Sequence, residues 1–290
     1  MIKKAYFEIT NVCNLSCSFC PGNKRKSGFI SVENFRTIAS KLSGRIPYLY
    51  LHLMGEPTIH PKLPEILGIT EELGFKVIIT TNGTTLREKE DTLCSFKCIH
   101  KISISLHSFE ANVKEKASTM EKYLGECFEF CRKASQNGII CVMRLWNLDG
   151  EDTLGCNSEN DNILAQMKQY FGDKWADTRS GKKVSDKIFL EYGERFDWPD
   201  PEMIKRYSTE DNEGYFCHGL RDQIGILWNG SVVPCCLDSE GSIVLGNLLE
   251  SSLEEILESE KAKYFYDCFS ARKAPHPLCK TCGYAKRFKR

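Results

Sequence analysis

The chain has 290 residues, and its 39 Lys and Arg balance 39 Asp and Glu, so the formal net charge is zero. This length accommodates one barrel-sized domain and a small second one. A chain without net charge has no global field that attracts nucleic acid or a membrane surface. No apolar run is long enough to span a bilayer, and residues 1–4 lead directly into a strand without the apolar segment of a signal peptide.

The cysteine content indicates the compartment. Fifteen cysteines are present, and an odd number argues against a closed disulfide framework. Clustered thiols in a reducing compartment more often bind metal. We therefore expect a cytoplasmic protein that has neither nucleic acid nor a membrane as a partner.

Strand-like and helix-like segments alternate along the first two thirds of the chain. Ser31 is a candidate helix N-cap, and Gly74 and Gly138 end the helices that lead into the third and fifth strands. Six repeats of strand and helix predict an α/β fold with a parallel sheet and outer helices, although periodicity alone does not distinguish a barrel from a doubly wound sheet. The expected strands cover residues 5–10, 48–53, 76–81, 100–106, 139–145 and 187–192. The expected helices cover residues 31–42, 61–73, 84–96, 109–136 and 160–171.

The pattern changes after about residue 200. Residues 149–186 read as a helix with a loop insertion, and two prolines, Pro199 and Pro201, end the repeats. Beyond them, Asn229-Gly230 predicts a hairpin of residues 223–229 and 231–233. A strand is expected at 242–245 and a helix at 251–269. We divide the chain into a core of residues 1–200, a linker of residues 201–216 and a small Cys-rich α+β domain of residues 217–290.

Three cysteines follow the first expected strand. Cys13, Cys17 and Cys20 have the spacing C-x3-C-x2-C, with Phe19 before the last of them. The loop lacks the second Cys pair of a zinc ribbon and the fourth Cys of a ferredoxin run. Thiolates are suitable ligands for iron–sulfur clusters. Three ligands can hold a 4Fe–4S cluster and leave one iron open to a small molecule. Structural cysteines, or a zinc loop with a remote fourth ligand, are the alternatives.

This loop resembles the signature of the radical S-adenosylmethionine (SAM) superfamily. The resemblance implies a partial (β/α)6 barrel and a 4Fe–4S cluster whose open iron binds SAM. It also implies a one-electron reductant such as flavodoxin or ferredoxin, and cleavage of SAM to methionine and a 5′-deoxyadenosyl radical. In Met54-Gly55-Glu56-Pro57, the first three residues stand where the family has Gly-Gly-Glu. Gly55 and Glu56 match this motif, whereas Met54 replaces its first glycine. Gly55 and Glu56 are therefore expected to meet the SAM ammonium group.

Further SAM-binding residues are expected where parallel strands end, since functional side chains of β/α barrels gather there. The resemblance assigns Ser105, at the end of the fourth strand, to the ribose or carboxylate of SAM. Arg144 or Lys116 is expected to clamp the carboxylate, and the bidentate fork of arginine favours Arg144. Asn82 ends the third strand and is a candidate as well. Ordinary turn and packing roles remain open for these positions.

Four cysteines near the C-terminus resemble the SPASM and Twitch domains that follow radical SAM cores. Cys217, Gly230 and Cys235 have the spacing that opens these domains, and Cys279 and Cys282 supply a second pair. The resemblance implies that these four thiols hold one auxiliary 4Fe–4S cluster. A zinc site made of the same four cysteines is the alternative.

Phe288 stands where a full SPASM domain has its next Cys, so a second auxiliary cluster is not expected. Cys236 and Cys268 are spare candidates that would replace one of the four ligands. The pairs Cys94/Cys98 and Cys127/Cys131 are each four residues apart, and we interpret them as small buried side chains.

The substrate is the least determined part of the prediction. A cluster held entirely by cysteines favours electron transfer, and hence a net oxidation or rearrangement. Because the chain starts at the first strand, we expect no N-terminal peptide-recognition domain and favour a small molecule or sugar-like compound. The alternatives are a maturase that modifies a peptide or protein side chain and a non-catalytic zinc-binding protein. No base or hydrogen donor is assigned. Candidate cavity residues are His107, Trp146, Glu191, Arg195, Trp198 and Asp238.

Overall fold

The computed structural model describes residues 2–111, 119–146, 159–193, 196–200 and 216–286. Its strands form one curved sheet in the order β11-β10-β9-β1-β2-β3-β4-β5-β8-β7-β6. The six predicted strands are neighbours in sequence order, and each pair is parallel. They are β1 (Lys4–Phe7), β2 (Tyr48–Tyr50), β3 (Lys76–Thr81), β4 (Ile99–Ser105), β5 (Ile140–Leu145) and β8 (Ile188–Tyr192).

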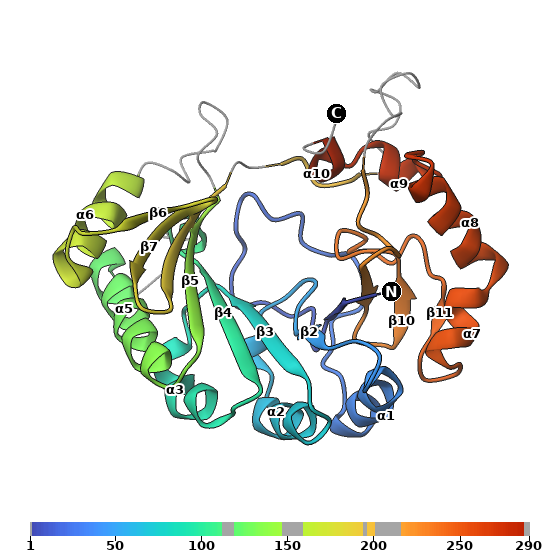
Figure 1. The fold of residues 1–290 in the computed structure, drawn as a ribbon, viewed down its shortest axis with the longest axis horizontal. Helices are drawn as coiled ribbons and strands as arrows, with labels where there is room; N and C mark the ends of the chain where they lie inside the picture. Colours follow the sequence, from blue (N-terminus) through green and yellow to red (C-terminus); the bar gives the residue numbers. More distant parts are fainter. Residues whose placement is uncertain (1, 112–118, 147–158, 194–195, 201–215, 287–290) are drawn as a thin grey trace.

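Five helices of the β/α repeats cover the outer side of this sheet (Figure 1). They are α1 (Val32–Leu42), α2 (Leu63–Glu72), α3 (Leu86–Ser95), α5 (Met120–Gln136) and α6 (Asn160–Phe171). Sequential strand order with helices on one face is the arrangement of an open β/α barrel. The predicted partial (β/α)6 barrel is therefore confirmed.

The alternation of side chains along the strands decides what faces the barrel interior. In β1, Ala5 and Phe7 are fully buried toward the helices, and the Phe7 ring stacks on Phe35 of α1 with 4.9 Å between centroids. Tyr6 points to the opposite face because side chains alternate along a strand. The interior thus receives polar and aromatic side chains, among them Tyr6 and Tyr50, and has room for a ligand.

The helix boundaries follow local capping chemistry. Ser31 caps α1, and its Oγ accepts the Asn34 N–H at 3.1 Å. Gly74 and Gly138 have φ of +76° and +90°, the left-handed conformation with which glycine ends a helix. These three predictions are confirmed.

Two predicted helices are divided. The helix predicted over 109–136 begins only at Met120, where Thr119 is the N-cap, and the short α4 (His107–Glu110) precedes it. The helix predicted over 251–269 consists of α7 (Leu253–Glu258) and α8 (Glu260–Ser270). Ser259 between them has an extended backbone and caps α8, because its hydroxyl accepts the Ala262 N–H.

Two strand predictions are wrong. Residues 176–185, expected to be a loop, contain the antiparallel strands β6 (Ala176–Thr178) and β7 (Gly181–Ser185), which extend the sheet from β8. All three residues of β6 are exposed, so no hydrophobic alternation marks it. The strand predicted at 242–245 is absent, and β11 is formed by Gly246–Asn247.

The Cys-rich region continues the barrel sheet. The predicted hairpin is confirmed as β9 (Gln223–Ile226) and β10 (Ser231–Val233), and β9 pairs in parallel with β1. The helices α7 and α8 lie at this end of the sheet, followed by α9 (Pro277–Lys280) and α10 (Gly283–Lys286) (Figure 1). Of the predicted linker, residues 201–215 lie outside the described residues. No helix of the described part is long and apolar enough to cross a bilayer.

Candidate active site and cluster cavities

The loop of three cysteines follows β1 and brings its thiols together. Cys13 Sγ accepts the Leu15 N–H at 3.4 Å and lies 3.9 Å from Asn82 Nδ2, while Cys20 Sγ accepts the Gly22 N–H at 3.4 Å. Burial raises the pKa of Cys13 and Cys20. A neighbouring thiol of the loop raises each pKa further, Cys17 that of Cys13 and Cys13 that of Cys20. Thiols that face one another and accept backbone N–H groups fit an iron–sulfur cluster. The charge of bound iron would keep them deprotonated.

The Gly55-Glu56 loop packs against the backbone of residues 10–12, which leads into the cysteine loop. Gly55 has φ of +76°, and a Cβ added there would lie 2.5 Å from Thr10 O and 2.8 Å from Val12 O. The Glu56 N–H donates to the same Val12 O at 2.8 Å. Only glycine permits this close approach, so Gly55 positions the backbone immediately before Cys13.

Glu56 joins the ends of two strands. One carboxylate oxygen accepts the Thr58 N–H and hydroxyl at 3.1 and 2.6 Å, and the other accepts the Asn82 N–H at 2.7 Å. Burial raises the pKa of Glu56, and these donors oppose the rise. The described protein groups therefore occupy both oxygens, and a contact of Glu56 with SAM stays a prediction.

We expect Gly55→Ala to destabilise the protein far more than Gly44→Ala. Both positions have positive φ, but nothing lies within 4 Å of a Cβ at Gly44. Left-handed strain alone costs about 1–2 kcal/mol, and overpacking adds about 1–3 kcal/mol at Gly55. Urea unfolding of the two variants measures the difference, and iron content should fall only in Gly55→Ala. Equal losses of stability would contradict the role given to Gly55.

A cavity of about 320 Å³ lies inside the barrel next to the cysteine loop. Phe19, Ser105 and Arg144 line it as predicted. Asn82 does not line the cavity, and its side chain lies beside Cys13. Lys116 and Arg195 lie outside the described residues. The lining also includes three of the cavity residues suggested by the sequence, which are His107, Trp146 and Trp198.

Arg144 is held at the cavity wall by two neighbours. Its Nε donates to Glu191 at 3.2 Å, and its guanidinium lies 4.6 Å from the centroid of the Trp146 ring. Glu191 does not line the cavity itself, but it fixes the position of Arg144, which does. A guanidinium fixed in this way is preorganised to bind a carboxylate.

His107 connects the cysteine loop to the ends of β4 and β5. The centroid of its ring lies 4.8 Å from that of Phe19. Its Nδ1 is 3.2 Å from the backbone oxygen of Arg144 and 3.4 Å from the backbone nitrogen of Trp146. Burial lowers the pKa of His107 to about 4, so the ring is neutral at pH 7.

Sequence reasoning missed much of the lining of this cavity, and three of the missed residues carry reactive or polar groups. His52, interpreted as structural, lines it, and burial lowers its pKa to about 3. Its buried Nδ1 has no hydrogen-bond partner within the described residues. Tyr6 and Cys236 also line the cavity. The alternation of β1 was the available signal for Tyr6, whereas no local pattern identifies Cys236.

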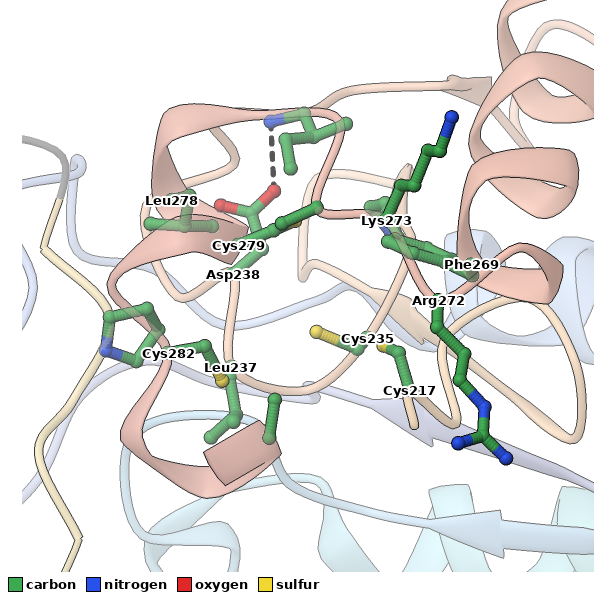
Figure 2. Close-up of a pocket in the computed structure, with 15 residues that line it drawn as sticks. Cys217, Cys235, Leu237, Asp238, Phe269, Arg272, Lys273, Leu278, Cys279 and Cys282 are labelled. Atoms are coloured by element: carbon green, nitrogen blue, oxygen red, sulfur yellow. Dashed lines mark hydrogen bonds between the residues drawn. The ribbon is translucent and has the colours of Figure 1, made fainter. Parts of the chain in front are cut away.

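The four predicted auxiliary ligands surround a second cavity. Cys217, Cys235, Cys279 and Cys282 all line a space of about 50 Å³ (Figure 2). Burial raises the pKa of Cys217 to about 11. It also raises the pKa of Cys235, which the neighbouring Cys236 and then the other three thiols raise further. Four thiols that face one another are a donor set suited to an iron–sulfur cluster.

The two spare cysteines do not line the auxiliary cavity. Cys236 lines the barrel cavity instead, and Cys268 lies on α8. Four thiols suit a zinc ion as well as an iron–sulfur cluster, so the choice of cluster stays a prediction.

Asp238 also lines the auxiliary cavity, but its carboxylate is used locally. Its two oxygens accept the Ser242 and Ile243 N–H groups, both at 2.8 Å. Figure 2 shows the Ile243 bond as a dashed line, with Arg272 and Lys273 among the lining side chains. Both side chains are exposed, and their charged ends point away from the four thiols.

A buried ion pair joins the cysteine loop to the Cys-rich region. Arg25 binds both oxygens of Glu8 at 2.9 and 2.7 Å and donates through Nε to Ser239 O at 2.6 Å. Glu8 also accepts the Met54 and Trp228 N–H groups, both at 3.3 Å. One carboxylate thus connects β1, the Gly55 loop and the auxiliary region.

Two family models match the chain. One, described as the radical SAM superfamily, matches residues 7–153, and the other, SPASM, described as an iron–sulfur cluster-binding domain, matches residues 217–283. The second match begins and ends around the four auxiliary cysteines. Both cysteine sets therefore lie inside matched domains.

Curated relatives extend over nearly the whole chain. The subtilosin biosynthesis protein AlbA of Bacillus subtilis is 24% identical over 97% of this chain, which spans 65% of that protein. The cofactor-modifying protein for tungsten-containing aldehyde ferredoxin oxidoreductase of Pyrococcus furiosus is 32% identical, with 97% and 87% covered.

Solved structures share the fold. BtrN in complex with AdoMet and 2-DOIA has a TM-score of 0.62 at 18% identity, with 97% and 93% of the two chains covered. Streptococcus suis SuiB bound to the precursor peptide SuiA has a TM-score of 0.59 at 15% identity, with 99% and 70% covered. At these identities the similarity concerns the fold alone.

Proposed function

The chain belongs to the radical SAM superfamily and carries a SPASM iron–sulfur domain, and from this we propose that it cleaves SAM and abstracts hydrogen from a substrate in the barrel cavity. The observation that supports this most directly is the position of the three-cysteine loop beside a cavity lined by Arg144 and Ser105. The cluster supplies the electron that cleaves SAM to methionine and a 5′-deoxyadenosyl radical.

The residues of the chain have distinct roles in this proposal. Cys13, Cys17 and Cys20 hold the first 4Fe–4S cluster, whose open iron binds SAM. Arg144 binds the SAM carboxylate, and Ser105 its ribose or carboxylate. Gly55 and Glu56 approach the ammonium group through their loop, and Asn82 orients the Cys13 thiol, from which its amide is 3.9 Å distant.

Cys217, Cys235, Cys279 and Cys282 hold an auxiliary 4Fe–4S cluster. Four protein ligands leave no open iron for substrate, which favours exchange of an electron with the substrate site. We propose a net oxidation or rearrangement, with flavodoxin or ferredoxin as the one-electron reductant. We propose that this chemistry takes place in the reducing cytoplasm, where unpaired thiols persist.

We favour a small molecule or sugar-like compound as the substrate. The cavity of about 320 Å³ is walled by aromatic rings, which suits a compact ligand. The similar BtrN structure contains 2-DOIA beside AdoMet. The second candidate is a peptide or protein side chain, and the names of AlbA and of SuiB with its precursor peptide support it about equally.

Iron counting during SAM cleavage tests the core of the proposal. The protein is purified without oxygen, reconstituted and reduced with SAM present. We expect about eight irons per chain, enough for two four-iron clusters, together with 5′-deoxyadenosine. About four irons with 5′-deoxyadenosine would leave the auxiliary site without a cluster. Zinc at both sites and no 5′-deoxyadenosine would contradict the proposal.

The substrate class is tested by fractionating a cell extract by size. The small-molecule fraction and the peptide fraction are added separately to the reconstituted enzyme. Stimulation of 5′-deoxyadenosine formation by the small-molecule fraction is expected. Stimulation by the peptide fraction alone would favour the second candidate.

A further inference from the structure

The first residues of β1 and β9 place two polar side chains next to each other in the barrel cavity. Lys4 begins β1 and Gln223 begins β9, and the two residues are direct partners in the parallel register of these strands. Both line the cavity. Because register partners point to the same face of a sheet, the Lys4 ammonium and the Gln223 amide share one region of this space.

Gln223 is built into the cavity wall and has no partner there. The residue is 7% exposed, and its side-chain amide forms no hydrogen bond within the described residues. Polar groups in such buried positions are nearly always hydrogen-bonded, so this amide indicates a partner that the chain itself does not supply. The amide atoms are not fully enclosed, and Gln223 lines the cavity, so the amide is available to a ligand there.

The Lys4 ammonium has aromatic neighbours in place of a counterion. Its Nζ lies 6.0 Å from the centroid of the Tyr6 ring and 6.0 Å from that of the Tyr50 ring. Both tyrosines also line the cavity. Aromatic rings at this distance attract an ammonium group but do not accept its charge as a carboxylate would. The rings therefore hold Lys4 in the wall and leave it without an anion.

A second lysine adds positive charge to the interior face. Lys101 lies on β4 four residues before Ser105, so both side chains point to the same face, and Ser105 lines the cavity. Burial and the nearby Arg144 lower the pKa of Lys101, as does Lys4, whereas Glu191 raises it. Lys101 forms neither an ion pair nor a hydrogen bond through its side chain within the described residues.

The neighbouring carboxylates do not neutralise these lysines directly. Three carboxylates belong to the strands of this wall or lie next to them, and each contacts another side chain: Glu8 with Arg25, Glu191 with Arg144 and Asp222 with His218. Among the described residues, no carboxylate oxygen lies within 4.0 Å of the amine of Lys4 or Lys101. Two ammonium groups and one amide thus stand on the interior face without a protein anion.

We propose that Lys4 and Gln223 bind an anionic oxygen group of the substrate, a carboxylate or a phosphate, and that Lys101 adds to the attraction. This rests on the proposed function. An ammonium and an amide both donate hydrogen bonds to such oxygens, and those from the ammonium are charge-assisted.

The position of this anion site fixes the orientation of the substrate. Lys4 and Gln223 begin their strands, whereas the cysteine loop follows the end of β1 and Arg144 lies near the end of β5. The anionic group is therefore held away from the cluster, and the carbon that loses hydrogen points toward SAM. Within the favoured class of substrate, a sugar acid or a sugar phosphate fits this site, and a neutral or purely cationic compound does not.

Anion binding is measured without turnover. The full-length, cluster-loaded, oxidised protein is saturated with SAM and titrated by calorimetry with inorganic phosphate and, separately, with acetate, at constant ionic strength in chloride. SAM occupies the open iron and Arg144, so these groups do not compete for the added anion. We expect saturable binding of at least one anion. Tighter binding of phosphate indicates a phosphorylated substrate, and tighter binding of acetate indicates a carboxylate.

Lys4→Met is the test variant and should weaken binding about 10- to 100-fold, as expected for loss of a hydrogen bond from a charged group. Lys4→Arg keeps the charge and should retain binding. Lys76→Met is the matched control, because Lys76 also begins a strand and lies 5.7 Å from a tyrosine ring, but it is exposed and does not line the cavity. No binding of either anion by the wild type, or equal binding by the wild type and Lys4→Met, would overturn the proposal.

Gln223→Glu tests the second group without a change of size. The new carboxylate repels an anion, so we expect binding to weaken at least as much as in Lys4→Met, while urea unfolding shows that the variant is folded. Unchanged affinity in folded Gln223→Glu would overturn the proposal. Formation of 5′-deoxyadenosine on reduction is measured separately. Its absence from the wild type would overturn the proposed function, whereas the titration alone decides the anion site.

The substrate in a cell extract supplies a second readout. The small-molecule fraction is passed over an anion exchanger at neutral pH before it is added to the reconstituted enzyme. The compound that stimulates 5′-deoxyadenosine formation should bind to the resin and be released by salt. Alkaline phosphatase should remove the stimulation if the group is a phosphate and leave it if the group is a carboxylate. Stimulation that stays in the unbound fraction would overturn the proposal.

Discussion

Cys13→Ala is expected to abolish 5′-deoxyadenosine formation and to remove about four of the eight irons per chain. The loop offers three thiols for the cluster, and the described contacts of Cys13 tie it to Asn82 and to the backbone of the loop. With two ligands left, the cluster is not retained and SAM has no iron to bind. Anaerobic iron analysis and quantification of 5′-deoxyadenosine measure the two losses.

Two variants control this result. Cys94→Ala changes a half-buried thiol on α3 that lines neither cavity, so both iron and 5′-deoxyadenosine should match the wild type. The double variant Cys279→Ala/Cys282→Ala should also lose about four irons but continue to cleave SAM. If Cys13→Ala retained SAM cleavage, the assignment of the three-cysteine loop would be wrong.

Arg25→Met is expected to lower the free energy of unfolding by about 3–5 kcal/mol, the range found when one partner of a buried ion pair is removed. The Glu8 side chain is fully buried, and the side chain of Arg25 is 14% exposed. Removing the guanidinium leaves the carboxylate with only the N–H groups of Met54 and Trp228. Urea unfolding of the iron-free protein at pH 7 measures the change.

An exposed ion pair provides the matched control. Arg36 and Glu72 form an equally short bidentate contact, but their side chains are 48% and 58% exposed. Surface pairs contribute about 0–1 kcal/mol, so Arg36→Met should have a small effect. Glu8→Gln combined with Arg25→Met should recover part of the stability, because no charge stays buried alone. A loss in Arg25→Met no larger than in Arg36→Met would show that the pair is not structurally important.

The periodic elements could be predicted because their signals are local. The six parallel strands and α6 appear where the apolar alternation and the caps place them, and Ser31, Gly74 and Gly138 mark boundaries through chemistry within one turn. The hairpin β6–β7 was missed for the opposite reason. Its strand β6 is wholly exposed and β7 buries only Val184 within the described residues, so the hairpin is held mainly by pairing with the edge of β8.

The first cluster loop is likewise readable from the sequence, since Cys13, Cys17 and Cys20 are close along the chain. The auxiliary ligands are 65 residues apart from first to last, counting from Cys217 to Cys282. Their spacing indicated four candidates and two spares. Only the fold shows that the two spares do not line the auxiliary cavity, since Cys236 lines the barrel cavity and Cys268 lies on α8.

The sequence by itself therefore determined the family, the alternation of parallel strands and helices, and the three-cysteine loop, since these depend on periodicity and on short spacings. The tertiary structure decided which face each side chain presents and what it meets. Glu56 is hydrogen-bonded to Thr58 and Asn82, and Cys236 lines the barrel cavity whereas its neighbour Cys235 lines the auxiliary cavity. Such directions depend on how strands distant in sequence pair, as β9 does with β1, and no local pattern encodes that pairing.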